Sequence, residues 1–204
     1  ARHGGGSVAL ELRRGEPKAV EEALRVIVDV KAEKLLRLQY TEILGEAPNT
    51  KAVPVLLGVV KNEPGSDLKR AALGALKPYD DFRVAEETIS IFPGLPSDLR
   101  QVAGTLLAGR TIFAAAFVNA VEAGKISVAL VSPEVVSLLR THTDPTLAGK
   151  VNELFSGAET DSAKLEMEIT RLARLVEAKT GSPYAGKKLF TTSCAACHKL
   201  FEQG

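Results

Sequence analysis

Residues 66–76, SDLKRAALGAL, and residues 97–107, SDLRQVAGTLL, decide the fold, because the second segment repeats the first. The first leucine of each, Leu68 and Leu99, has an earlier counterpart at Leu36, and the three are 32 and 31 residues apart. Each is followed by a basic residue and, eight positions later, by another leucine. A Ser or Asp before such an apolar run predicts a helix N-cap, because its side-chain oxygen accepts from a free backbone N–H. The sequence therefore predicts a recurring helix.

A second amphipathic helix is predicted before each copy. In the middle copy, Val53, Leu56, Leu57 and Val60 stand at positions i, i+3, i+4 and i+7, which is one face of a helix. The same face is formed before the other copies by Val20, Ala23, Leu24 and Ile27, and less regularly by Val84, Thr88 and Ile91. Turns are predicted at Gly45, Pro64-Gly65, Pro78 and Pro93-Gly94. The repeating unit is thus helix, turn, helix.

The pattern continues less regularly towards residue 157. A displaced fourth copy opens at Asp144 and closes at Phe155, and two further helices are expected between Arg110 and Thr143. Together these features predict an all-α fold in which residues 1–157 form an α-solenoid of short HEAT-like pairs, with residues 1–8 disordered. The period is shorter than the roughly 40 to 47 residues of HEAT repeats, so the subtype stays open. An irregular helical bundle is the alternative.

Residues 158–181 are predicted to connect this array to a second module. Leu165, Ile169, Leu172 and Val176 fall along one stripe of a long amphipathic helix. The Gly-Ser-Pro at residues 181–183 ends that helix, and another short helix is expected at about residues 184–191.

The clearest chemical motif is Cys194-Ala195-Ala196-Cys197-His198, a C-x-x-C-H box that uses both cysteines of the chain. This spacing is the attachment signature of a c-type haem. Two cysteines three positions apart lie on one side of a helical turn, so each thiol can form a thioether with one haem vinyl group. His198 then follows as the proximal iron ligand. The motif predicts one covalent haem c.

Besides a chance match, three other interpretations compete with haem attachment at the box. A structural zinc site needs four ligands, and only His3, His142 and carboxylates remain to complete one. A redox dithiol of the thioredoxin type follows a strand, whereas this region has a helical pattern. A disulfide across two residues would close a short loop and stabilise little.

Other candidate residues carry weaker signals. The single methionine, Met167, lies off the apolar stripe and is expected on the helix surface or at its edge. His142 is expected to be a solvated loop histidine, and His3 lies in a glycine-rich tail. The carboxylate pairs at residues 21–22, 80–81 and 86–87 are expected at turns or on exposed faces. No catalytic constellation is found, so the sequence assigns no enzyme activity to this segment.

The composition narrows the classes of partner that the sequence predicts. The 26 Lys plus Arg balance 25 Asp plus Glu, which gives no nucleic-acid footprint and no polybasic membrane anchor. The most apolar run, residues 112–118, is shorter than the about 20 residues that a membrane span needs. No transmembrane segment is predicted, and the chain is expected to be cut from a longer protein.

The order of array and box resembles the C-terminal part of the large haem-binding, membrane-bound dehydrogenase-like proteins of the planctomycete–verrucomicrobial type. The segments that carry the likeness are residues 66–72, 121–125, 130–134, 142–145 and the Gly-Lys-Lys-Leu-Phe at 186–190, together with the box. In that family a sugar-dehydrogenase-like propeller precedes HEAT-like repeats and a cytochrome c domain. The resemblance implies that residues 182–204 are the N-terminal part of a truncated cytochrome c domain.

The resemblance also implies haem on Cys194 and Cys197, His198 as proximal ligand, and a periplasmic or otherwise extracytoplasmic location with membrane association through the larger protein. The first functional hypothesis is electron transfer from an upstream dehydrogenase domain, through the haem, to a redox partner, with the solenoid as spacer. The second is a scaffold that binds a partner protein along the solenoid. A zinc or thiol redox module is the third.

Overall fold

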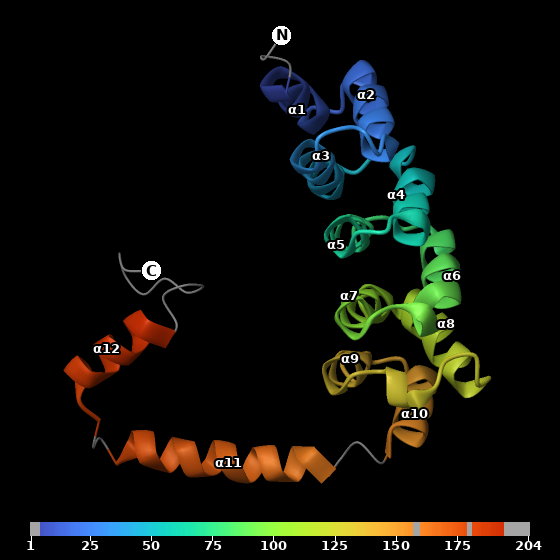
Figure 1. The fold of residues 1–204 in the computed structure, drawn as a ribbon. Coiled ribbons are helices and arrows are strands. Elements are labelled where there is room, and N and C mark those ends of the chain that lie inside the picture. Colours follow the sequence, from blue (N-terminus) through green and yellow to red (C-terminus); the bar gives the residue numbers. More distant parts are fainter. Residues whose placement is uncertain (1–4, 157–159, 179–180, 194–204) are drawn as a thin grey trace. The chain divides into compact units, whose positions relative to one another are not determined.

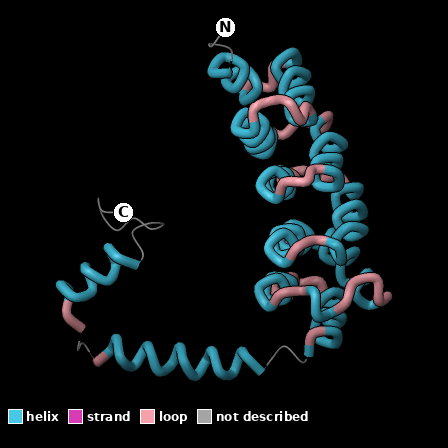
Figure 2. The backbone as a smooth tube through the Cα atoms, in the orientation of Figure 1, coloured by secondary structure: helices cyan, strands magenta, loops and turns pink. Residues whose placement is uncertain are grey.

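The computed structural model describes residues 5–156, 160–178 and 181–193, and every regular element in these ranges is a helix (Figures 1 and 2). The prediction of an all-α chain is confirmed for them. Contacts between Cα atoms divide the chain into two units, Ala1–Ser156 and Gly157–Gly204. The division falls beside residue 157, where the array was predicted to end.

The helices of the first unit alternate between two layers (Figure 1). Within a layer, each helix contacts the helix two elements further along the chain. One layer consists of α1 (Gly5–Arg13), α3 (Lys34–Glu46), α5 (Ser66–Ala75), α7 (Ser97–Ala108) and α9 (Pro133–Leu139). The other consists of α2 (Pro17–Val28), α4 (Ala52–Asn62), α6 (Phe82–Ile91), α8 (Thr111–Glu122) and α10 (Pro145–Leu154), and the 3₁₀ turns η1 (Phe92–Gly94) and η2 (Val128–Leu130) follow α6 and α8.

One continuous core lies between the layers, and the apolar faces predicted from the sequence supply it. Val53, Leu56, Leu57 and Val60 of α4 are all buried, as predicted. Larger side chains fill the middle of the unit, where the Phe92 and Phe117 rings lie 5.1 Å apart between centroids. Buried apolar area is the main favourable term in folding, so this shared core holds the successive pairs together.

The Ser-Asp-Leu motif has a different role from the predicted N-cap. Helix α5 begins at Ser66 itself, after Gly65, and no side chain caps its first turn. The carboxylate of Asp67 instead accepts a hydrogen bond from the Lys34 ammonium of α3 at 2.5 Å. This bond lowers the pKa of Asp67. The second copy behaves alike, because Asp98 of α7 pairs with Arg70 of α5 at 2.5 Å.

The fourth repeat copy was placed wrongly. Asp144 does cap α10, with its side chain accepting from the Leu147 N–H at 2.8 Å. However, α10 contacts α8 and so belongs to the layer of the first helices of each pair. Helix α9, which starts at Pro133 and lacks the Leu-basic opening, takes the place after α7.

Two further local predictions are wrong. A helix begins at Gly5, so residues 5–8 are ordered as part of α1, while residues 1–4 lie outside the described residues. Gly45 is not in a turn but inside α3. A Cβ at Gly45 would stand 2.8 Å from the Ala75 Cα, so glycine is needed there for the close approach of α3 and α5.

The second unit contains α11 (Thr160–Glu177) and α12 (Pro183–Ser193). The long helix predicted after the array is therefore confirmed. Its apolar stripe is exposed, since Ile169, Leu172 and Val176 keep 57%, 46% and 78% of their accessible surface. No helix among the described residues is both long and apolar enough to span a membrane.

A buried ion pair connects α2, α3 and the end of α4. The Arg37 side chain is 8% exposed, and its Nη2 lies 2.6 Å from Oε2 of Glu63, which is 13% exposed. The Arg37 Nε also donates to the Ile27 carbonyl at 2.9 Å. Removing one partner of a buried pair leaves the other charge without compensation.

We therefore expect Glu63→Ala to lower the free energy of unfolding by about 3 kcal/mol, because Arg37 stays buried without its partner. Glu87→Ala is the matched control, since its pair with Lys61 is about 40% exposed on both sides. The control should cost less than about 1 kcal/mol. Urea unfolding followed by circular dichroism measures both, and equal losses would contradict the assignment.

Two fully buried threonines give a second test. The Thr41 hydroxyl donates to the Arg37 carbonyl at 2.8 Å, whereas the Thr88 hydroxyl has no hydrogen-bond partner among the described residues. A buried polar group without a partner keeps its desolvation cost. Thr88→Val should raise the free energy of unfolding by about 1 kcal/mol, and Thr41→Val should lower it by about the same amount. Thermal unfolding measures both, and a destabilised Thr88→Val variant would refute the account.

Candidate functional site

Helix α12 leads directly to the C-x-x-C-H box. Its start follows from the sequence, because Pro183 suits the first turn of a helix and the Ser182 carbonyl accepts from the Gly186 N–H at 2.9 Å. The helix ends at Ser193, one residue before Cys194. The predicted site residues Cys194, Cys197 and His198 themselves lie outside the described residues.

The residues ahead of the box present apolar side chains at the surface of α12. Tyr184 is 89% exposed and Leu189 is 66% exposed, while Phe190 is partly buried. At Gly186, no atom of the described residues lies within 4 Å of the position that a Cβ would occupy. The described residues therefore leave open space beside Gly186 on this helix.

His142 lies in a loop, as predicted, but it is half-buried and hydrogen-bonded rather than fully solvated. Its Nε2 lies 2.7 Å from the Ala108 carbonyl oxygen and its Nδ1 lies 3.3 Å from the Thr111 hydroxyl. A carbonyl only accepts, so Nε2 is the donor to Ala108, while the Thr111 hydroxyl can either donate to Nδ1 or accept from it. His142 thereby connects the loop before α10 to the junction of α7 and α8.

The carboxylate pairs contact cations rather than one another. Asp81 caps α6 through the Arg83 N–H at 3.0 Å, and the Arg83 side chain lowers the pKa of Asp81. In the other pairs, Glu22 bonds Arg25 and Glu87 bonds Lys61. The expectation of surface or helix-start charges is confirmed, and none of these contacts forms an acid–base dyad.

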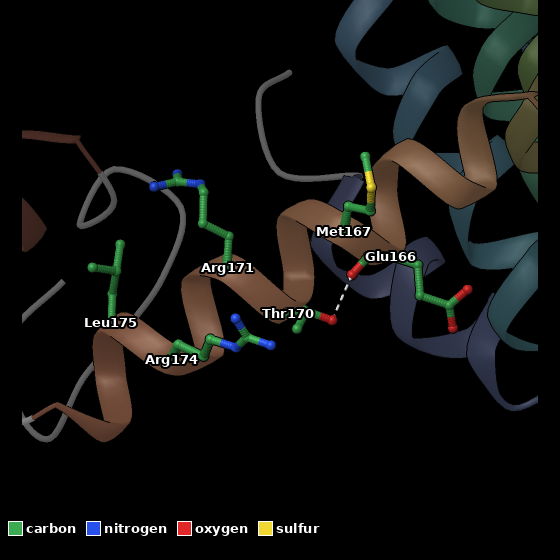
Figure 3. Close-up of a pocket in the computed structure, with 6 residues that line it drawn as sticks. All are labelled: Glu166, Met167, Thr170, Arg171, Arg174 and Leu175. Carbon is green, nitrogen blue, oxygen red and sulfur yellow. Dashed lines mark hydrogen bonds between the residues drawn. The ribbon is translucent and has the colours of Figure 1, made fainter.

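The described residues also lack a metal-binding cluster, because no three His, Cys, Asp or Glu side chains among them come together. Met167 is 70% exposed on α11, which confirms it as a surface residue. A hollow of about 630 Å³ lies along α11 beside Met167, Thr170 and Arg174 (Figure 3). The Thr170 hydroxyl donates to the Glu166 carbonyl there, and the described residues that line the hollow all belong to α11.

Sequence inspection missed the roles of Arg37 and His142. The sequence marks Arg37 only as the basic residue after Leu36, yet its side chain is buried in the first unit. No signal in a single sequence distinguishes Arg37 from the equivalent Lys69 and Arg100. The difference arises in the fold, which places the Ile27 carbonyl and Glu63 beside Arg37. The anchoring of His142 likewise depends on residues 31 and 34 positions away.

Comparison with known proteins gives no relative. No family model, no curated protein and no solved structure matches the chain.

Proposed function

We propose that this chain carries one covalent haem c on Cys194 and Cys197, with His198 as the proximal iron ligand, and that it transfers electrons through this haem. The observation that carries the proposal is the C-x-x-C-H spacing, which uses both cysteines of the chain and follows a helix that continues to Ser193. Two thiols and an imidazole are the donor set that thioether attachment and axial ligation require.

The described surface of α12 fits an apolar macrocycle near the box. Leu189 stands five positions before Cys194, and its side chain is largely exposed. A haem attached at residues 194 and 197 would cover apolar surface of this kind, and each buried methylene group would contribute about 0.8 kcal/mol. When bound, the haem supplies one-electron chemistry. The chain would hold it covalently and provide the His198 imidazole.

We further propose that residues 5–156 form an α-solenoid of short HEAT-like pairs that serves as a spacer. The two-layer order of the helices supports this assignment. So do two ion pairs between successive helices of one layer, Lys34 with Asp67 and Arg70 with Asp98, in which the aspartates hold equivalent positions of the repeat. In a solenoid each repeat contacts mainly its neighbours, and this pattern of contacts agrees with that rule.

In this proposal the chain is a segment of a dehydrogenase-like oxidoreductase that works outside the cytoplasm. An upstream domain would reduce the haem, and an external redox partner would accept the electron. The resemblance in repeat order and in residues 186–190 supports this placement. The solenoid as a partner-binding scaffold is the alternative, supported by the same two-layer order of helices.

The test is a pyridine haemochrome spectrum of the full chain, exported in a bacterial host that has a cytochrome c assembly system. We expect a c-type spectrum that survives denaturation, because thioether bonds are covalent. The Cys194→Ala/Cys197→Ala double variant should lose it, and His142→Ala, which changes a histidine outside the box, should keep it.

Absence of covalent haem in the parent chain would overturn the electron-transfer proposal and leave the scaffold as the function to pursue. Retention of haem by the double cysteine variant would also overturn it. In the His198→Ala variant, loss of the native visible spectrum with the cysteines intact would support the role of His198 as the iron ligand.

A further inference from the structure

A hollow of about 260 Å³ in the first unit is lined by the ends of α2 and α4 and by α3. The buried ion pair of Arg37 and Glu63 lines one part of it. Four apolar residues line the rest, namely Val28, Val30, Val59 and Pro64. Val28 and Val30 keep 55% and 76% of their accessible surface, so apolar surface is exposed beside the charged pair.

The ion pair leaves one donor and one acceptor unused. Arg37 donates from Nε to the Ile27 carbonyl and from Nη2 to Glu63 Oε2, whereas its Nη1 forms no hydrogen bond with the described residues. Glu63 Oε1 likewise has no hydrogen-bond partner among them. Of the described side chains that are not exposed, only the Thr88 hydroxyl is sealed from solvent without a partner, so both atoms remain accessible. A guanidinium N–H and a carboxylate oxygen are therefore available to a group that enters the hollow.

These two atoms indicate the charge of a ligand that fits. The guanidinium only donates and the carboxylate only accepts, so the ligand needs an acceptor for Arg37 and a donor for Glu63. Hydrogen bonds are about twice as strong when the partners are ionised, which favours an anionic acceptor and a cationic donor. Because Arg37 and Glu63 neutralise each other, a ligand without net charge leaves no uncompensated charge beside the buried pair. An α-amino acid carries both groups on one carbon atom.

The size and walls of the hollow indicate the rest of the ligand. Pockets for drug-sized molecules have volumes of roughly 300 to 1,000 Å³, so this hollow suits a smaller molecule. Gly58, in the interior of α4, also lines it, and a Cβ there would meet no atom within 4 Å. Unlike Gly45, Gly58 is not required by a helix contact, but it leaves the wall of the hollow open. The apolar residues can then cover a short aliphatic side chain.

We propose that this hollow binds a free α-amino acid with a branched aliphatic side chain, such as leucine. Its carboxylate accepts from Arg37 Nη1, and its ammonium donates to Glu63 Oε1. Its side chain contacts the four apolar residues. The residues involved all belong to the first unit, so the site does not depend on the proposed haem.

An NMR titration of the full chain, with ¹³C in its valine methyl groups, tests the site. L-Leucine should shift the methyl signals of Val28, Val30 and Val59 with a Kd of about 1 mM or below, and should leave those of Val135 in α9 unchanged. Three analogues with the same carbon skeleton test the charges. They are 4-methylpentanoate without the ammonium, 3-methylbutylamine without the carboxylate, and the neutral 4-methylpentanamide. Each should bind about tenfold more weakly than leucine or worse, because each loses at least one charged hydrogen bond.

Gly58→Leu should fill the hollow and weaken leucine binding about tenfold or more. Gly74→Leu is the matched control, because Gly74 is also a half-buried glycine of a helix, α5, where a Cβ would meet no atom within 4 Å, but it does not line the hollow. It should keep the parent's affinity. Circular dichroism checks that both variants fold, and the analogue series on the parent chain tests the proposal without any variant.

Absence of methyl shifts at about 10 mM leucine would overturn the proposal. So would a folded Gly58→Leu variant that binds leucine as well as the parent. If 4-methylpentanoate or 4-methylpentanamide bound as tightly as leucine, the assignment to an amino acid would be wrong.

Discussion

The close approach of successive helices within one layer sets the spacing of the first unit. A Cβ at Gly45 of α3 would meet the backbone of Ala75 at 2.8 Å, and one at Gly104 of α7 would meet the Val135 side chain of α9 at 2.6 Å. Glycine therefore lets these helices come together at two steps of the layer. Because one pair of helices cannot bury its apolar face alone, the neighbouring pairs must complete its core. The ion pairs of Asp67 and Asp98 span the same layer.

Periodicity predicted the helices well, because the spacing of apolar residues is a property of each helix alone. The faces of α2 and α4 were predicted residue by residue, and so was the long helix α11. The predictions that failed concern residues whose role depends on which other helix lies beside them in the fold. Asp67 is a plausible N-cap in isolation, but Lys34 of α3 gives it an ionic partner. Gly45 resembles a turn residue until Ala75 is seen beside it.

The candidate site has the opposite character. Its chemistry is contained in three residues of sequence, Cys194, Cys197 and His198, and their spacing predicts the haem without any fold. What a haem pocket adds, namely the second axial ligand and the groups that set the potential, comes from residues far apart in sequence. Of the surface that a haem could cover, the described residues supply α12 with its exposed apolar side chains. The haem therefore stays a proposal, which rests on the motif and on the helix before it.

The two units differ in where their helices bury apolar surface. In the first unit the apolar faces of the helices meet inside the chain, as the buried Ile27, Leu56 and Leu107 show. In α11 and α12 the apolar side chains are largely exposed, and an isolated helix as short as α12, with 11 residues, is marginal in water. Helices of this kind gain stability chiefly by covering an apolar face. The exposed side chains beside a C-x-x-C-H box suit a covalently held macrocycle.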